Sequence, residues 1–298
     1  MRNFLILTAL VLAVALPVAG QDGLALMKVE PGARPAGMAG AFASITGDPM
    51  SAAYNPAGAT GVGKFVASFG HNEYWENIRL ETGYCVAPLA KDWYIHAGVR
   101  FAAVTDLESR LLPTSEPEGT FDAHDVSFKA GVAWQINSML AAGLAAGWFI
   151  EKIEAYQGSA FNVDIGLTAT PMPNLSLGAS ASNLGSDFSL SQTGLRNSDD
   201  ISLPTTYRVG GSYRYLKYLG AADLVVIDDE THLHLGVEGE LYPRFVLRSG
   251  YMLGYDVKNF AAGASFHVPR YGMVVDYGFV PYSDGLGSSH LFNLTVGL

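Results

Sequence analysis

Residues 161–170 read Phe-Asn-Val-Asp-Ile-Gly-Leu-Thr-Ala-Thr, so Phe, Val, Ile, Leu and Ala alternate with Asn, Asp, Gly and Thr. Successive side chains of a strand point to opposite faces, which predicts a strand with one apolar and one polar face. Similar stretches, each ending in a turn, recur from about residue 63 to the C-terminus. A single strand of this kind fits a soluble sandwich or a membrane barrel. Its recurrence behind an export signal, with charges on the polar face, is typical of a transmembrane β-barrel.

The first 20 residues have the form of a cleavable signal peptide. Arg2 gives a basic start, an unbroken apolar run extends from Phe4 to Leu16, and small residues follow up to Gly20. This order predicts cleavage after Gly20. The alternative, a membrane anchor, fits less well because the run is shorter than the roughly 20 apolar residues of a membrane helix. We therefore expect three parts: a signal peptide (1–20), an N-terminal segment (21–62) and a barrel (63–298).

The composition excludes several classes of protein. The chain is apolar, with a mean hydropathy of +0.19 and 15% charged residues, yet no segment after the signal peptide is long enough for a helical span. The single cysteine, Cys85, excludes an internal disulfide. A net charge of −10 argues against nucleic acid as a partner. We expect no cofactor, and outer-membrane lipid around the barrel.

Alternation and turn signals together predict about fourteen strands, an even number as in closed bacterial barrels. The ranges are 63–71, 77–87, 91–103, 122–134, 138–152, 158–170, 174–184, 202–215, 219–228, 232–241, 244–253, 258–268, 270–280 and 289–298. The longest links, 104–121 and 185–201, follow odd-numbered strands, whereas links after even-numbered strands are short and often contain proline. Outer-membrane barrels have short periplasmic turns and longer external loops, so this sorting favours a barrel.

Charged side chains are predicted to face the lumen, because a charge at the lipid midplane costs roughly 2–4 kcal/mol. Ile78 and Leu80 are placed outward on the same argument, and the strand at 219–228 is the least regular because Asp223 interrupts its alternation. The predicted lumenal polar network consists of Arg79, Glu81, Arg100, Asp164, Arg208, Arg214, Glu238, Glu240, Arg248 and Asp276.

Residues 21–62 do not alternate and are rich in Gly, Ala and Pro. They predict short helices and tight turns that cannot form a core of their own. Fourteen strands enclose a lumen that would leak if it were open. We therefore expect this segment to fold inside the barrel as a hatch; the alternative is a disordered tail.

The same segment resembles a known family. The stretch from Gly32 to Phe42, then Asp48 and the run Tyr54-Asn55-Pro56-Ala57-Gly58, resembles the N-terminal signature of the PorV/PorQ family. That family is a branch of the FadL-like (long-chain fatty acid transporter) superfamily of outer-membrane barrels. The resemblance implies a 14-stranded barrel with a hatch, in the outer membrane of a diderm bacterium. It also implies that Asn55, Pro56, Ala57 and Gly58 form the gate; the alternative is that they only shape a capped turn.

Two functions follow from the resemblance. The first is passage of a small hydrophobic compound through the hatch-gated lumen. The second is a scaffold linked to type IX secretion, which binds secreted protein cargo or partners through the loops 104–121 and 185–201. The sequence does not separate these two hypotheses.

Catalytic and metal sites are the weaker interpretations. Ser265 and His267 share one strand face, as an esterase pair could, but the period of two creates many such pairs by chance. His232, His234 and Glu238 also share a face, yet one strand rarely supplies converging metal ligands. The acidic hairpin 228–230 is interpreted as a solvated turn rather than a calcium site. We therefore expect neither an enzyme nor a metal site.

Overall fold

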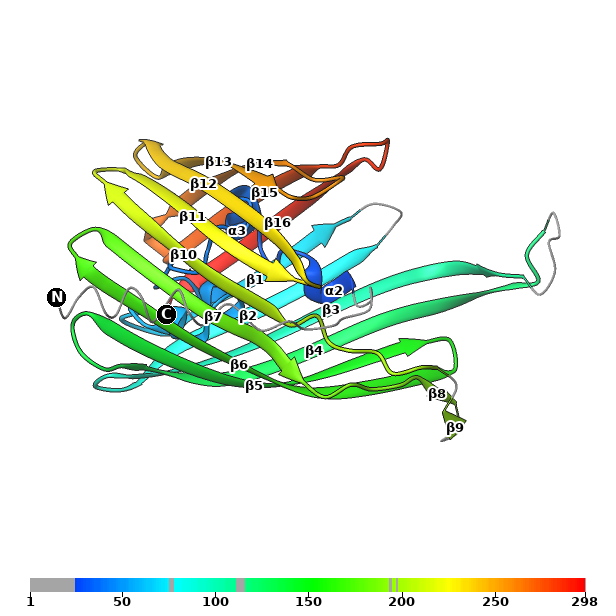
Figure 1. Cartoon of the computed structure of the whole chain (residues 1–298). Coiled ribbons are helices and arrows are strands. Elements are labelled where there is room, and N and C mark those ends of the chain that lie inside the picture. The colour runs from blue at the N-terminus through cyan, green and yellow to red at the C-terminus, as the bar shows by residue number, and fades with distance from the viewer. Residues whose placement is uncertain (1–24, 75–77, 111–115, 193–194, 197, 298) are drawn as a thin grey trace.

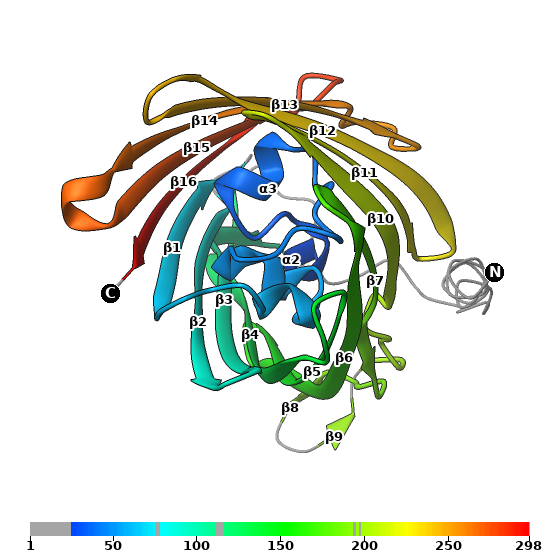
Figure 2. The same ribbon diagram turned by 90° about the vertical axis from the view of Figure 1, so that its left-hand side faces the viewer.

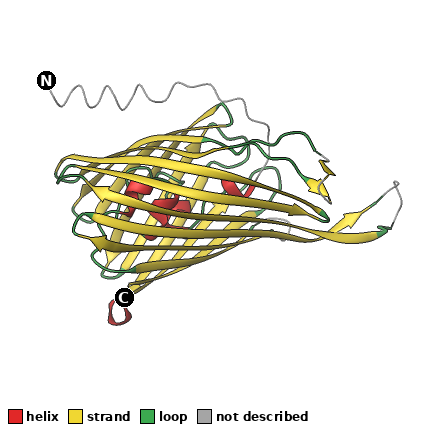
Figure 3. Ribbon diagram, turned by 90° about the horizontal axis from the view of Figure 1, so that it is seen from below, coloured by secondary structure: helices red, strands yellow, loops and turns green. Residues whose placement is uncertain are grey.

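The computed structural model describes residues 25–297 of the chain, apart from 75–77, 111–115, 193–194 and 197. The predicted signal peptide, residues 1–20, lies outside the described residues. The rest forms a closed, antiparallel β-barrel with short helices of the N-terminal segment inside it (Figures 1 and 3).

The strands of the barrel wall are β1 (Val66–Glu73), β2 (Arg79–Ala90), β3 (Trp93–Ser109), β4 (Gly119–Gln135), β5 (Leu140–Ile153), β6 (Tyr156–Met172), β7 (Leu175–Gly185), β10 (Thr206–Tyr215), β11 (Tyr218–Ile227), β12 (Glu230–Tyr242), β13 (Phe245–Leu253), β14 (Phe260–Val268), β15 (Met273–Pro281) and β16 (Ser288–Gly297). The other elements are the helices α2 (Ala25–Lys28) and α3 (Ala33–Gly37), the 3₁₀ helices η2 (Pro49–Ala53), η3 (Pro56–Ala59) and η5 (Pro269–Tyr271), and the short strands β8 (Ser191–Gln192) and β9 (Leu195–Arg196).

The barrel closes because every wall strand pairs with two antiparallel neighbours. The strands follow chain order around the wall, β7 pairs with β10, and β1 pairs with β16. Of the 16 strands in the sheet, β8 and β9 form a small hairpin beside β6, which leaves 14 in the wall. The predicted 14-stranded barrel is confirmed, and each predicted range overlaps one wall strand.

The two ends of the barrel differ in the length of their connections. Links 91–92, 173–174 and 216–217 lie at what we call the short-turn end. Links 110–118 and 186–205 lie at the opposite, long-loop end, where the β3–β4 hairpin projects beyond the other strands (Figure 1). This is the sorting of links that the sequence predicts.

The outer face of the wall is apolar. Large side chains such as those of Phe69, Leu144, Trp148, Val237 and Phe292 are exposed there. A belt of this kind is what transmembrane barrels present to lipid. Within the described residues, no helix has the length and hydropathy needed to cross a bilayer.

The side chains of β2 face the opposite way from the sequence prediction. Leu80 is buried in the lumen against Leu26 and Phe149, whereas Arg79 and Glu81 lie on the outer face. Near the long-loop end, Arg79 lies 3.9 Å from Glu73 and Glu81 pairs with His71. Leu80 packs in an apolar lumenal cluster, so its neighbours Arg79 and Glu81 must point to the outer face. They therefore take no part in a lumenal network.

The strand that looked least regular in sequence is regular in the structure. On β11 the inward residues are Leu219, Ala221, Asp223 and Val225, all buried. Asp223 keeps the period of two and points into the lumen. The interruption in the sequence marks a contact rather than a defect of the strand.

Residues 25–62, which we call the plug, lie inside the ring of strands (Figure 2). Asp48 caps η2 by accepting from the Met50 amide, and Asn55 caps η3 in the same way. Helices this short are marginal alone, so contacts with the wall must hold them in place. Helix α3 packs on β14 and β15, and η3 packs on β5 and β6.

Candidate functional site

The candidate site is the interface between the plug and the inner wall, and the Asn55–Gly58 turn is part of it. The side-chain amide of Asn55 donates to the carbonyl oxygens of Ala43 (2.8 Å) and Leu167 (3.0 Å), and its Oδ1 accepts from the Ala57 amide (3.0 Å). Asn55 is fully buried. One side chain therefore caps the turn, ties two parts of the plug together and fastens both to β6.

Glycines of the wall let the plug backbone approach closely. A β-carbon at Gly236 of β12 would lie 2.6 Å from the Met38 carbonyl oxygen, and one at Gly250 of β13 would lie 2.6 Å from the Ala39 amide. Gly236 and Gly250 are direct partners across their two strands. A larger side chain at either position would push the plug backbone inward.

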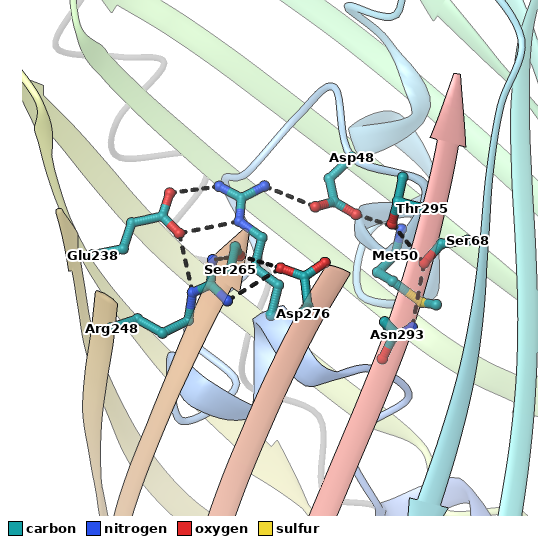
Figure 4. Close-up of polar contacts among 10 residues, drawn as sticks. Asp48, Met50, Ser68, Glu238, Arg248, Ser265, Asp276, Asn293 and Thr295 are labelled. Carbon is teal, nitrogen blue, oxygen red and sulfur yellow. Dashed lines mark hydrogen bonds and ion pairs between the residues drawn. The ribbon is translucent and has the colours of Figure 1, made fainter. Parts of the chain in front are cut away.

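A polar cluster joins α3 to the wall near the short-turn end. The guanidinium of Arg34 donates to Glu238 through Nη2 (2.7 Å) and Nε (3.1 Å), and to Asp48 through Nη1 (2.7 Å). Behind it, Arg248 lies 3.5 Å from Glu238 and 3.2 Å from Asp276 (Figure 4). The cluster therefore alternates in sign, and Glu238 links the cation of the plug to the cation of the wall.

The charges of this cluster stabilise each other. Burial alone would lower the pKa of Arg34, but the carboxylates of Glu238 and Asp48 outweigh it and raise the pKa above its usual value. Arg34 therefore stays charged. Removing one partner of a buried pair of this kind leaves the other charge buried without compensation. Three predicted network residues, Glu238, Arg248 and Asp276, are thus brought together, and the plug supplies a partner that the sequence did not indicate.

Asp223 is the second anchor of the plug, besides Arg34, and its role was not predicted from the sequence. Its carboxylate accepts from the backbone amides of Phe42 and Ala43, each at 2.7 Å. The residue is 1% exposed. A buried acid inside an otherwise alternating apolar strand was the available signal, since such a group must have a partner.

The other predicted network residues are spread along the lumen. Asp164 pairs with Lys129 at 2.6 Å. Arg100 donates to the carbonyl of Val29 in the plug (2.6 Å), and Arg208 to that of Gly40 (3.5 Å).

Arg214 and Glu240 lie apart from these contacts, at the short-turn end. They line a polar vestibule of about 580 Å³ that also borders Arg34 and Asp48. This hollow lies between the plug and the barrel mouth. It makes the plug accessible from the short-turn side.

An apolar cluster occupies the lumen at the long-loop end. Phe188 of the β7–β10 link turns inward, exchanges two backbone hydrogen bonds with Ile201, and packs against Phe149 with a ring separation of 5.9 Å. Leu26 of the plug and Leu203 complete the cluster with Leu80. Phe188, which lies in the 185–201 loop named for the scaffold hypothesis, is 6% exposed because burial of its ring outweighs exposure.

The residues considered for catalysis and for metals have other partners. Ser265 donates to Asp276 and accepts from Arg248. The ring of His232 stacks on Tyr255 at 3.8 Å, and that of His234 lies 2.9 Å from the Tyr255 hydroxyl. In the acidic hairpin, Asp228 forms an ion pair with Lys28 of the plug. Among the described residues, no three His, Cys, Asp or Glu side chains are grouped as a metal site requires.

Comparison with known proteins identifies the fold. No family model and no curated protein matches the sequence. The P. putida toluene transporter TodX superposes with a TM-score of 0.67 at 12% identity, covering 91% of this chain and 99% of that one. The CymD monoaromatic hydrocarbon channel gives 0.63 at 13% identity (91% and 98%). A Pseudomonas aeruginosa FadL homologue gives 0.56 at 11% identity (94% and 98%). The chain therefore has the same fold as these three proteins.

Proposed function

We propose that the chain forms an outer-membrane channel that passes a small hydrophobic compound, and that the plug is its gate. The observation that carries this proposal is that a separate segment of the chain, the plug, lies inside the lumen and packs on the wall. The plug is held by polar anchors, by backbone contacts and by the packing of its apolar side chains on the wall. A segment held in this way can shift without unfolding the wall.

The neighbours in fold support the class of compound. TodX is a toluene transporter and CymD a monoaromatic hydrocarbon channel. Apolar molecules of that size cross a water-filled pore poorly, so a channel for them needs an apolar route and a closure against polar solutes. The Phe149–Phe188 cluster at the long-loop end supplies apolar surface next to the plug.

In this proposal the Asn55–Gly58 turn is the part of the gate that leaves the wall. Its fastening to β6 consists of the hydrogen bond from Asn55 to the Leu167 carbonyl and the close packing of η3. Release of the turn would open a path along β5 and β6. Because Asn55 also holds the Ala43 carbonyl, the stretch around Ser44 would move with the turn, while Arg34 keeps α3 attached to the wall.

A reversible cross-link tests whether the plug must move. Ser44 of the plug lies with its Oγ 2.9 Å from the Oγ of Ser212 on β10, close enough for a disulfide after Ser44→Cys and Ser212→Cys. Cys85 is replaced by Ser in the same chain. The measurement is the uptake rate of radiolabelled toluene by cells that lack another hydrocarbon channel. We expect uptake in the reduced protein and its loss after oxidation.

A second cross-link of the same geometry is the control. Ser68 and Thr295 lie 2.9 Å apart, but both belong to the wall, on β1 and β16. The pair Ser68→Cys and Thr295→Cys should leave uptake unchanged in either redox state. Equal uptake with the plug free and locked would refute the gate, and absence of uptake in the reduced protein would refute the channel.

The alternative proposal is a PorV/PorQ-like scaffold that binds secreted cargo. One observation favours it: the β3–β4 hairpin, with two strands of 17 residues each, projects beyond the wall at the long-loop end (Figure 1). A pull-down from a host with a type IX system, using the chain with and without residues 106–122, tests this function. Capture of secreted cargo that depends on the hairpin would support the scaffold over the channel.

A further inference from the structure

A small cavity between the plug and the wall is lined by three cations. It measures about 40 Å³ and is bordered by Arg100, Lys129 and Arg208. No carboxylate lines it within the described residues. Met27 and Ala53 of the plug close it from one side. A concentration of like charge in an enclosed space is unfavourable unless something neutralises it.

Only one of the three cations has a carboxylate partner. Lys129 is paired with Asp164 at 2.6 Å. Among the described residues, neither Arg100 nor Arg208 has a carboxylate within 4.0 Å. The Nε of Arg100 is buried and makes no hydrogen bond there. The guanidinium of Arg208 stacks on Tyr54 at 4.9 Å and donates to the Gly40 carbonyl, and neither group carries a negative charge.

Hydroxyl groups around the same cavity also lack partners. Tyr84, Ser127 and Ser182 line it and are 5%, 4% and 7% exposed. Within the part of the chain that the structure describes, none of these three hydroxyls forms a hydrogen bond. The neighbouring Thr206 instead donates to the Pro204 carbonyl. These three hydroxyls are therefore free to donate to a group bound in the cavity.

The nearest acids are committed to other groups. Glu30 lines a neighbouring cavity of about 50 Å³, where it pairs with Lys258 at 3.3 Å. Asp223 holds two amides of the plug through Oδ2, and its buried Oδ1 forms no hydrogen bond with a described residue. From these observations we propose that the cavity between Arg100 and Arg208 binds one small monovalent anion, such as a halide or a free small carboxylate.

The size of the cavity limits the ligand. A cavity needs roughly 10–15 Å³ to hold one water molecule, so 40 Å³ accepts a single ion with little else. The chain of a larger acid has no room. Arg100, Lys129 and Arg208 of the wall would bind such an anion by charge-assisted hydrogen bonds, and Met27 and Ala53 of the plug would enclose it. This site does not depend on whether the barrel passes hydrophobic compounds.

The first measurement is the thermal unfolding midpoint of the detergent-purified barrel. Unfolding is monitored through the loss of the β-sheet circular dichroism signal. Sodium bromide replaces sodium gluconate stepwise at constant ionic strength, because the chain of gluconate cannot fit the cavity. A ligand that binds only the folded state raises the midpoint in a saturable manner. We expect this for bromide and acetate. A midpoint that does not respond to the anion, or responds without saturation, would overturn the proposal.

Variants locate the site. Arg100→Gln should raise the half-saturating bromide concentration about tenfold or more, since it removes a charge-assisted hydrogen bond. Ser127→Ala should raise the half-saturating concentration by a smaller factor. Arg214→Gln is the matched control, because Arg214 lines the vestibule and not this cavity. Equal responses in Arg100→Gln and Arg214→Gln would place the anion elsewhere.

Diffraction keeps the proposal testable if Arg100→Gln does not fold. Crystals of the wild-type protein grown with bromide should show an anomalous peak between Arg100 and Arg208. A peak absent from this cavity, with ordered water in its place, would refute the site whatever the uptake assays show.

Discussion

Gly143 of β5 lies directly opposite Gly166 of β6, and the Asn55–Ala57 turn of the plug occupies the space that side chains at these two glycines would need. A β-carbon at Gly143 would clash with the Pro56 carbonyl carbon and the Ala57 amide, and one at Gly166 would clash with Asn55 Oδ1. The wall therefore has a hollow, made by two glycines in register, that receives the turn we propose as the gate.

Filling this hollow should displace the turn. We expect Gly143→Ala to lower the stability of the plugged state by about 1–3 kcal/mol, the usual range for overpacking, and to raise toluene uptake. Gly220→Ala is the control, because a β-carbon at Gly220 on β11 meets nothing within 4 Å. Thermal unfolding and uptake of the two variants give the answer. Identical behaviour of both would show that the hollow does not hold the turn.

Removal of the second anchor should free the middle of the plug. Asp223→Ala leaves the buried amides of Phe42 and Ala43 without an acceptor, and each orphaned donor costs about 1–3 kcal/mol. We expect faster cleavage of the plug in limited proteolysis while the wall stays resistant. Asp223→Asn keeps one acceptor oxygen, so its plug should be cleaved at a rate between those of Asp223→Ala and the wild type. The role is refuted if Asp223→Ala is cleaved at the wild-type rate.

The sequence was sufficient for the barrel but not for the contacts of its lumen. Strand number and most side-chain directions follow from a period of two, which the chain carries in each strand on its own. The direction of the β2 side chains was predicted wrongly. The alternation of residues 78–81 shows which of them share a face, but not which face points to the lumen. Only the lumenal cluster around Leu80, built from residues distant in the sequence, decides between the two.

Asp223 and the wall glycines illustrate the same limit. In sequence Asp223 interrupts a strand, and its partners lie 180 and 181 residues away. Glycine-rich strands predict a crowded wall, but the pairing of Gly143 with Gly166 requires the register of β5 and β6. This register is set by the two-residue turn 154–155, and the predicted strand ends, 152 and 158, do not locate that turn.

Acidification should weaken one anchor of the plug, the pair of Glu30 with Lys258. Burial acts to raise the pKa of Glu30, but the Lys258 ammonium, a backbone hydrogen bond and His234 outweigh it and lower the pKa below its usual value of 4.5. A carboxylate with a lowered pKa in the folded state stabilises that state fully above its unfolded pKa, and this stabilisation disappears as the pH falls through the folded value. The anchor should therefore be intact at neutral pH and weaken only below pH 4.5.

The variant Glu30→Gln lacks this contribution at every pH. Its stability deficit, measured by urea unfolding of the detergent-solubilised barrel, should be largest near pH 7 and shrink towards about pH 3. Glu108→Gln is the control: Glu108 pairs with Arg110 on the exposed hairpin, where ion pairs contribute about 0–1 kcal/mol, so its deficit should be small throughout. A deficit of Glu30→Gln that is equal at both pH values would mean that Glu30 acts through packing, and that its charge does not hold the plug.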